Sequence, residues 1–301
     1  MKSLEERQVS VCLLFLFLSL GAPRETRPDD DGIADAILPT PLETIAEVPF
    51  ELYQHHLIVT SGSIGRLNGL SLLIDTGSIP SVVDGRIARK LHLQAEPSML
   101  VAFGHSVRIQ STVLDGFRIG AMSSGPVPAA VSDLSYLEGV AIDAIVGLDV
   151  LARQSFRIDY RARVLTFAPT GREDWTAPLE LAWPFLTVQM TIAGQQVRLL
   201  VDTGSSDFVL YKSRLPAPLS SAPWRGDKIV RYASGVARLQ RLDLREVGLG
   251  DHVWDRLEVW ALDRVPHGHH PASIDGVLGV LALGCARVRF DFERSELGCS
   301  R

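Results

Sequence analysis

The chain carries the tetrapeptide Asp-Thr-Gly-Ser twice, at residues 75–78 and at residues 202–205. Each copy lies between apolar runs, in LLIDTGSIPSVV and LLVDTGSSDFVL, a pattern that predicts a strand, a tight turn and a second strand. A carboxylate at the end of a buried strand costs free energy unless it is hydrogen-bonded or shares a proton with a second acid. Two such acids could divide acid and base roles between them. One copy alone would equally fit an ordinary turn, because Asp-x-Gly is common turn chemistry.

Both tetrapeptides belong to a longer repeat. The downstream segments AIDAIVGLDVLARQSFRIDYRARVLTF and SIDGVLGVLALGCARVRFDFERSELGC align without a gap. The matched positions, each pair 132 residues apart, are Asp143 and Asp275, Gly147 and Gly279, and Asp159 and Asp291. A period of this length indicates a duplicated small domain rather than a solenoid repeat. We therefore expect two homologous lobes, at residues 45–170 and 180–301.

These blocks resemble the aspartic proteases of the pepsin and retropepsin superfamily, especially bacterial two-lobed retropepsin-like proteins. In that family each lobe carries a hydrophobic-hydrophobic-Asp-Thr-Gly-Ser/Ala segment, followed by a hydrophobic-hydrophobic-Gly segment that crosses near it. The hydrophobic-hydrophobic-Gly segment is matched here by Ile145-Val146-Gly147 in the first lobe and Val277-Leu278-Gly279 in the second. The resemblance covers roughly residues 45–300. It implies an all-β fold of two lobes with a cleft between them and a few short helices, one after each second Gly segment and one around Gly85–Leu91.

The resemblance assigns the chemistry to Asp75 and Asp202 as a pair. Two carboxyl groups within about 3 Å share one proton, so neither can be called the acid or the base alone. The resemblance implies an exported aspartic endopeptidase that activates water between these groups. A non-catalytic peptide-binding protein that retains the fold is the alternative.

The resemblance also gives roles to the neighbours of the two acids, namely Thr76, Gly77, Ser78, Thr203, Gly204 and Ser205. The threonine hydroxyls would reach the backbone of the opposite lobe, and glycine suits the close approach of a tight turn. The serine hydroxyls would donate to the outer carboxylate oxygens. Because such bonds favour the charged form, they predict an acid-shifted pH optimum.

Two hairpins are candidates for the flap that covers the substrate in this family. Phe103 and Gly104 lie between strand-like runs in the first lobe, and Tyr232 and Gly235 do so in the second. An ordinary surface hairpin remains the alternative for each.

Composition favours a globular protein without nucleic-acid partners. Apolar residues make up 46% of the 301 residues, and the formal net charge is −5. The histidine clusters, His55-His56 and His267-Gly268-His269-His270, are interpreted as loop residues rather than metal ligands, because no Cys or carboxylate accompanies them at ligand spacing. We expect no metal and no cofactor. The expected partner is a peptide or protein substrate in extended conformation.

The first 44 residues are interpreted as a targeting segment and a linker. Lys2 and Arg7 precede an apolar run of about 12 residues, too short to span a bilayer as a helix, so residues 1–22 are predicted to be a signal peptide. Residues 23–44 form a polar linker. The protein is therefore expected to be secreted or periplasmic, with an uncleaved membrane anchor as the alternative.

Two cysteines, Cys285 and Cys299, lie outside the leader. A hairpin turning at residues 293–295 would place Cys299 opposite about Phe290, some 16 Å along the strand from Cys285. This estimate favours free thiols over a disulfide. With both acids in one chain, we expect a monomer with internal pseudo-twofold symmetry, although pairing of each lobe with a second chain stays open.

Overall fold

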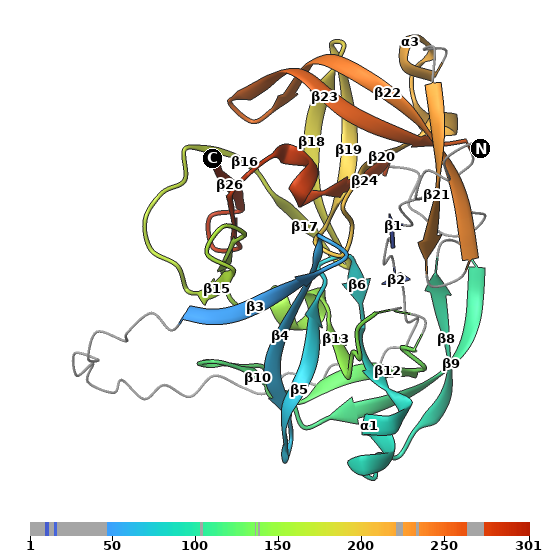
Figure 1. Cartoon of the computed structure of the whole chain (residues 1–301), viewed down its shortest axis with the longest axis vertical. Coiled ribbons are helices and arrows are strands. Elements are labelled where there is room, and N and C mark those ends of the chain that lie inside the picture. Colours follow the sequence, from blue (N-terminus) through green and yellow to red (C-terminus); the bar gives the residue numbers. More distant parts are fainter. Residues whose placement is uncertain are drawn as a thin grey trace, which may run out of the picture.

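A computed structural model describes residues 10–11, 15–16, 47–102, 105–135, 137, 139–220, 225–232, 235–263 and 274–301. These residues form mainly β-strands, arranged as two lobes with a third group of strands beside them (Figure 1). The predicted all-β, two-lobed architecture is confirmed.

The first lobe contains β3 to β13. Its strands are β3 (Glu47–Tyr53), β4 (Leu57–Ile64), β5 (Leu67–Ile74), β6 (Ser78–Ile79), β7 (Ser81–Asp84), β8 (Glu96–Ala102), β9 (His105–Leu114), β10 (Phe117–Ile119), β11 (Met122–Ser123), β12 (Val127–Ser132) and β13 (Ala144–Val146).

The second lobe repeats this plan with β17 to β24. Its strands are β17 (Glu180–Ala182), β18 (Phe185–Ile192), β19 (Gln195–Asp202), β20 (Phe208–Tyr211), β21 (Arg225–Tyr232), β22 (Gly235–Leu249), β23 (His252–Leu262) and β24 (Gly276–Gly279).

The helices are short, and three of them lie where the sequence predicts helices. The helical segments are α1 (Gly85–Lys90), α2 (Leu148–Leu151), α3 (Ala217–Ser220), and the 3₁₀ turns η1 (Lys212–Arg214) and η2 (Val280–Leu283). Both α2 and η2 follow the glycine of a second Gly segment. Asp84 begins α1 because its side chain accepts a hydrogen bond from the Arg86 amide at 2.8 Å. Among the described residues, no helix is long and apolar enough to cross a membrane.

The strand pairing repeats between the lobes at the level of single residues. β5 runs parallel to β13, and β19 runs parallel to β24, so each second Gly segment lies directly beside the strand that leads to an Asp. The repeated acids Asp143 and Asp275 have matching roles as well. Their Oδ2 atoms accept backbone hydrogen bonds from Ser71 at 3.0 Å and from Arg198 at 2.9 Å. The duplication inferred from the sequence is therefore a duplication of structure.

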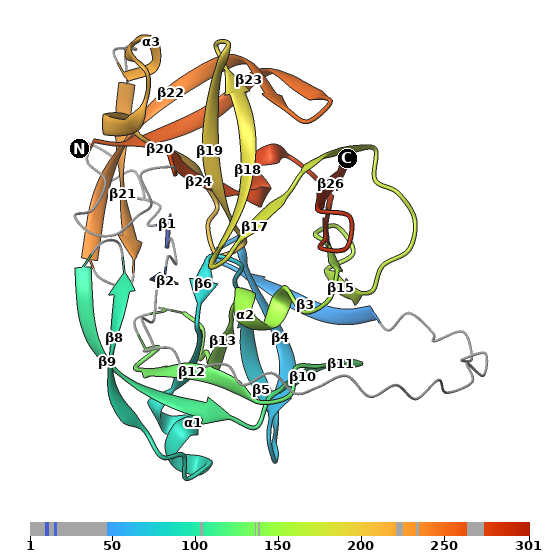
Figure 2. The same ribbon diagram turned by 180° about the vertical axis from the view of Figure 1, so that it is seen from behind.

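A shared set of strands joins the lobes. It comprises β14 (Phe156–Asp159), β15 (Val164–Phe167), β16 (Trp175–Pro178), β25 (Arg287–Asp291) and β26 (Glu296–Ser300), in the order β16-β26-β25-β14-β15-β3. β14 from the first repeat pairs with β25 from the second. Their neighbours β15 and β26 lie at one side of the molecule in both views (Figures 1 and 2). Neither half could complete this sheet alone.

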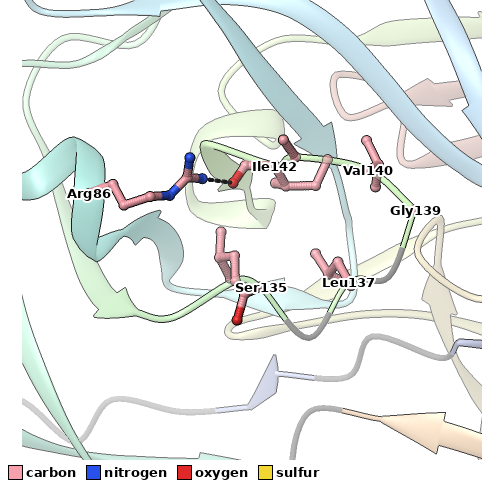
Figure 3. A pocket seen from close by; sticks show the side chains of 8 residues that line it. Arg86, Ser135, Leu137, Gly139, Val140 and Ile142 are labelled. Atoms are coloured by element: carbon pink, nitrogen blue, oxygen red, sulfur yellow. Dashed lines mark hydrogen bonds between the residues drawn. The ribbon is translucent and has the colours of Figure 1, made fainter.

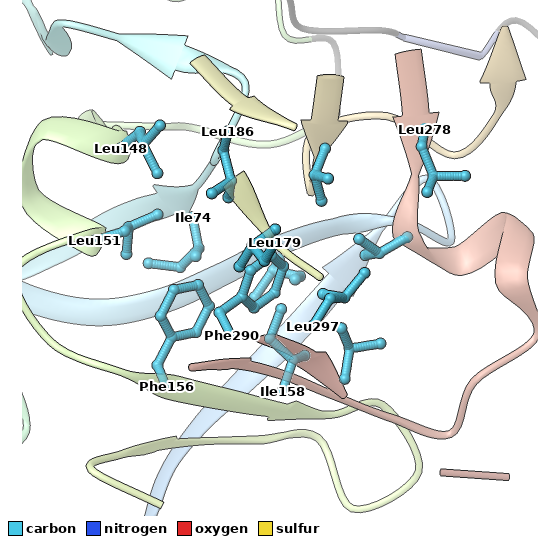
Figure 4. Packing of buried hydrophobic residues seen from close by; sticks show 14 of the residues in the cluster. Ile74, Leu148, Leu151, Phe156, Ile158, Leu179, Leu186, Leu278, Phe290 and Leu297 are labelled. Atoms are coloured by element: carbon cyan, nitrogen blue, oxygen red, sulfur yellow. The ribbon is translucent and has the colours of Figure 1, made fainter. Parts of the chain in front are cut away.

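The largest hydrophobic core is also continuous between the halves. Figure 4 shows Ile74, Leu148 and Phe156 of the first half packed with Leu278 and Phe290 of the second. Phe156 and Phe290 stack with ring centroids 4.6 Å apart, and neither ring is exposed to solvent. The lobes therefore form one packed unit rather than two linked domains.

Two short N-terminal strands lie between the lobes in both views (Figures 1 and 2). The first, β1 (Ser10–Val11), runs parallel to β21, with Ser10 opposite Val230. The second, β2 (Phe15–Leu16), runs parallel to β6, with Phe15 opposite Ser78. Residues from the predicted leader thus pair with both lobes.

The prediction of free thiols is wrong, because Cys285 and Cys299 form a disulfide with their Cα atoms 5.7 Å apart. In the β25–β26 hairpin Cys299 lies opposite Val288, not Phe290. The pairing extends past the start of β25, since the Ala286 amide donates to the Ser300 carbonyl at 2.8 Å. These two features bring Cys285 next to the final strand.

Replacing Cys299 by serine should lower the free energy of unfolding by about 3 kcal/mol, the entropy that closing a loop of this length removes from the unfolded chain. Urea unfolding of the oxidised protein measures this change. Cys285→Ser removes the same bridge and should lower the midpoint equally. Equal midpoints for the oxidised protein and Cys299→Ser would show that the bridge does not stabilise the fold.

Candidate active site

The two predicted acids meet at the boundary between the lobes. Asp75 directly follows β5, Asp202 ends β19, and both side chains are fully buried. A Cβ atom on Gly77 would lie 2.5 Å from the Asp202 Cγ atom, and one on Gly204 would lie 2.8 Å from the Asp75 Cγ atom. Each turn glycine is therefore required because the carboxyl group of the opposite lobe fills the space of a side chain.

Backbone amides orient both carboxyl groups. Asp75 Oδ1 accepts a hydrogen bond from the Gly77 amide at 2.9 Å, and Asp202 Oδ1 accepts one from the Gly204 amide at 2.7 Å. The two Oδ2 atoms are buried and have no hydrogen-bond partner. Each acid thus keeps one oxygen that is not committed to its own turn.

The two threonines cross between the lobes as the resemblance implies. The Thr76 hydroxyl donates to the Val201 carbonyl at 2.9 Å, and the Thr203 hydroxyl donates to the Ile74 carbonyl at 3.0 Å. Each hydroxyl also accepts from the amide of the other threonine, at 3.0 and 3.1 Å. Four hydrogen bonds therefore hold the two turns in register.

The two serines do not act as predicted. The Ser78 hydroxyl donates to the Pro80 carbonyl at 3.2 Å, and the Ser205 hydroxyl contacts the Asp207 backbone. Neither serine reaches the Oδ2 atom of its neighbouring acid. The physical reason is that both turns fold back within two residues, so a backbone carbonyl comes within reach of the short side chain. The two hydroxyl groups therefore stabilise the turns rather than the charged form of the carboxyl groups.

Burial controls the protonation of the pair. Loss of solvation raises the pKa of Asp75 to about 6. Loss of solvation, followed by repulsion from Asp75, raises the pKa of Asp202 well above its ordinary value. Since both causes penalise the doubly ionised state, the pair holds a shared proton at weakly acidic pH.

Asp149 and Ser81 support the turn of the first lobe and were not identified from the sequence. Asp149 Oδ1 accepts from the Ser81 amide at 3.0 Å and from its hydroxyl at 2.8 Å, while the Ser81 oxygen accepts from the Gly147 amide at 2.9 Å. Burial raises the pKa of Asp149. In the repeat, Asp149 aligns with Leu281, so this break in the repeat was the signal available in the sequence.

Apolar side chains accompany each acid. Because side chains alternate along a strand, Leu73 shares a face with Asp75, and Leu200 shares a face with Asp202. Leu73 belongs to a small aliphatic cluster that includes Leu134, Leu137 and Ile142. The same three residues line a cavity of about 380 Å³, where Arg86 donates to the Ile142 carbonyl at 3.2 Å (Figure 3). Leu200 packs instead with Phe185 and Tyr211, so the surroundings of the two acids differ.

Both predicted flap segments lie at the ends of β-hairpins. Strands β8 and β9 pair up to Ala102 and His105, and strands β21 and β22 pair up to Tyr232 and Gly235. The ends of the two hairpins face each other in both views (Figures 1 and 2). Phe103 and Gly104 lie outside the described residues, as do the side-chain surroundings of Tyr232. The flap role therefore stays a prediction.

Of the two histidine clusters, the structure describes His55-His56. His56 is buried and its Nδ1 atom lies 2.8 Å from the Gln54 carbonyl oxygen. The cluster His267-Gly268-His269-His270 lies outside the described residues. In the parts of the chain that the structure describes, no three His, Cys, Asp or Glu side chains are grouped to hold a metal ion.

The fold and the paired carboxyl groups define a two-lobed protein of the retropepsin-like class. A family profile described as aspartyl protease matches the chain twice, over residues 61–150 and 188–281, which is more than half of its length. The chain belongs to the aspartyl protease family. A search of curated proteins found no match.

Thr76→Val should lower the free energy of unfolding by about 2–3 kcal/mol, because it removes two buried hydrogen bonds and leaves the Val201 carbonyl and the Thr203 amide unsatisfied. Chemical denaturation measures the loss. Thr76→Ser keeps the hydroxyl and should retain most of the stability. Equal losses in the two variants would exclude the hydroxyl as the stabilising group.

Asp202→Asn should stabilise the protein more at neutral pH than at pH 4. Both acids have raised pKa values in the folded state, so the folded protein binds their protons more tightly than the unfolded chain does. The resulting contribution to the free energy of unfolding is complete below about pH 4 and is lost as the pH rises through about 6. Thermal midpoints of both proteins between pH 3 and 8 test this, with Asp251→Asn, at an exposed carboxylate, as the control. Parallel curves for the wild type and Asp202→Asn would contradict the raised pKa values.

Proposed function

We propose that this protein is an endopeptidase that hydrolyses peptide bonds with a water molecule activated between Asp75 and Asp202. The observation that supports this proposal best is the reciprocal packing of each carboxyl group against the turn glycine of the other lobe. A protein that only bound peptides would not need to bury two acids that repel each other. The two uncommitted Oδ2 atoms are suited to hold water.

The reaction requires one ionised and one protonated carboxyl group. The ionised group removes a proton from water, whose oxygen forms a bond to the peptide carbonyl carbon, and the protonated group donates its proton to the carbonyl oxygen. The resulting tetrahedral diol collapses when the peptide nitrogen accepts a proton and the C–N bond breaks. The products are a carboxylic acid and an amine. The pair regains its single shared proton, so it is unchanged after each turnover.

An extended substrate fits the strand edges around the acids. The chain's own residues pair there: Phe15 and Leu16 align with Ser78 and Ile79 directly after the Asp75 turn, and Ser10 and Val11 align with β21. A peptide that adds a strand gains backbone hydrogen bonds whatever its sequence. This pairing supports an extended peptide as the substrate and explains how an endopeptidase could accept varied sequences.

We further propose that the enzyme works outside the cytoplasm as a monomer. The disulfide between Cys285 and Cys299 supports export, because disulfides persist in oxidising compartments. Residues 1–22 are the proposed signal peptide. Both acids belong to one chain, and strands of both repeats complete one sheet, which supports a monomer.

We expect Asp75→Asn and Asp202→Asn each to abolish cleavage of a quenched peptide library, with a loss of at least about 10³-fold, since neither acid can replace the other. The profile of the wild type should be highest on the acid side of neutrality, because the shared proton is lost as pH rises above about 6. A pepstatin-like transition-state analogue should inhibit it.

Asp133→Asn, at an exposed carboxylate of the first lobe, is the matched control and should retain activity. Cleavage that survives either dyad substitution would exclude the shared mechanism. Peptide binding without cleavage by the intact protein would favour the peptide-binding alternative.

A further inference from the structure

An ion pair links a hairpin of the second lobe to the turn that carries Asp202. Lys228, on β21, places its Nζ atom 2.6 Å from Asp207 Oδ1 and 4.2 Å from the ring centroid of Trp260. The side chains of Lys228 and Asp207 are only 21% and 13% exposed. A contact of this kind is screened less by solvent than a surface ion pair.

Asp207 is itself part of the turn at the active site. Its carbonyl accepts a hydrogen bond from the Gly279 amide at 2.8 Å, and its amide donates to the Ser205 hydroxyl at 3.3 Å. Gly279 lies opposite Asp202 in the pairing of β19 with β24. A displacement of the Asp207 side chain would therefore shift the residues that position Asp202.

Apolar packing beside the ion pair fixes which side of the hairpin faces the lobe. Val230, two residues after Lys228 on the same strand, packs with Val209 and Leu239. Since side chains alternate along a strand, Lys228 and Val230 face the same way, toward β20 and β23. The ion pair thus continues a contact between the hairpin and the body of the lobe.

The first lobe has different residues at the matching positions. Pro80 aligns with Asp207 in the two Asp-Thr-Gly-Ser segments, and the matched hairpin ends place Ser98 where the second lobe has Lys228. Proline and serine carry no charge, so the hairpin β8–β9 cannot form the same ionic contact. The duplicated lobes therefore differ in how a hairpin is attached beside the acid.

We propose that Lys228 is a positioning residue, which together with Asp207 and Trp260 anchors the hairpin β21–β22 to the Asp202 turn. The second-lobe side of the substrate site is therefore preformed, whereas the matching positions of the first lobe, Pro80 and Ser98, carry no charge. The consequence for substrate binding depends on the proposed function, but the anchor itself does not.

Hydrogen–deuterium exchange tests the anchor without reference to activity. In Lys228→Met the amides of residues 225–232 and 235–249 should exchange about tenfold faster than in the wild type, because Asp207 loses its cation and the hairpin loses its attachment. Arg238→Met is the matched control. It breaks a 2.6 Å ion pair with Asp227 on the same hairpin, but that pair is exposed and should change exchange less than about twofold. Equal effects of the two substitutions would overturn the proposal.

Enzyme kinetics then test the positioning role. Lys228→Met should raise KM about tenfold and change kcat less than about threefold, because the substrate must bind to a hairpin that is no longer held in place. Lys228→Arg keeps the cation and should recover most of the affinity. An unchanged KM together with faster exchange would show an anchor without a role in binding. Absence of any cleavage by the wild type would reject the proposed function but leave the exchange result valid.

Discussion

The carboxyl groups of Asp75 and Asp202 are buried together in this protein, and the reciprocal hydrogen bonds of Thr76 and Thr203 hold them in place. Each threonine hydroxyl donates to a backbone carbonyl of the opposite lobe and accepts from the amide of the other threonine. The glycines that follow leave no room for any side chain but the opposite carboxyl group. The repulsion between the acids is relieved by a shared proton, and the same proton is what general acid–base chemistry needs. The feature that is costly for folding is therefore the feature that the proposed catalysis would use.

Repetition in the sequence was sufficient to predict the main parts of the fold. Residues that occur twice in matching surroundings, such as Asp75 and Asp202 or Gly147 and Gly279, occupy equivalent places in the two lobes. The helices after each second glycine and the crossing threonines were also predicted correctly, because short-range patterns and family resemblance both fix them. These features depend on local geometry that is the same in both copies.

Features that depend on exact register, or that occur in one lobe only, could not be predicted. The disulfide was missed because a shift of two residues in the β25–β26 hairpin decides whether Cys285 reaches Cys299. The serine hydroxyls were misassigned because the turns bend back toward Pro80 and Asp207. Asp149 and Lys228 interact with residues that are distant in the sequence. The repeated segments do not indicate that Ser81 and Asp207 are their partners. Tertiary context decides such contacts.

The sheet that contains β14 and β25 has a consequence for how the site responds to dilution. In a protein assembled from two separate chains, the fraction of complete sites falls as the concentration falls. Here both halves of the sheet belong to one polypeptide, so the encounter of Asp75 with Asp202 is intramolecular and its effective concentration is set by the fold. Every folded molecule therefore contains a complete pair, even at low protein concentration.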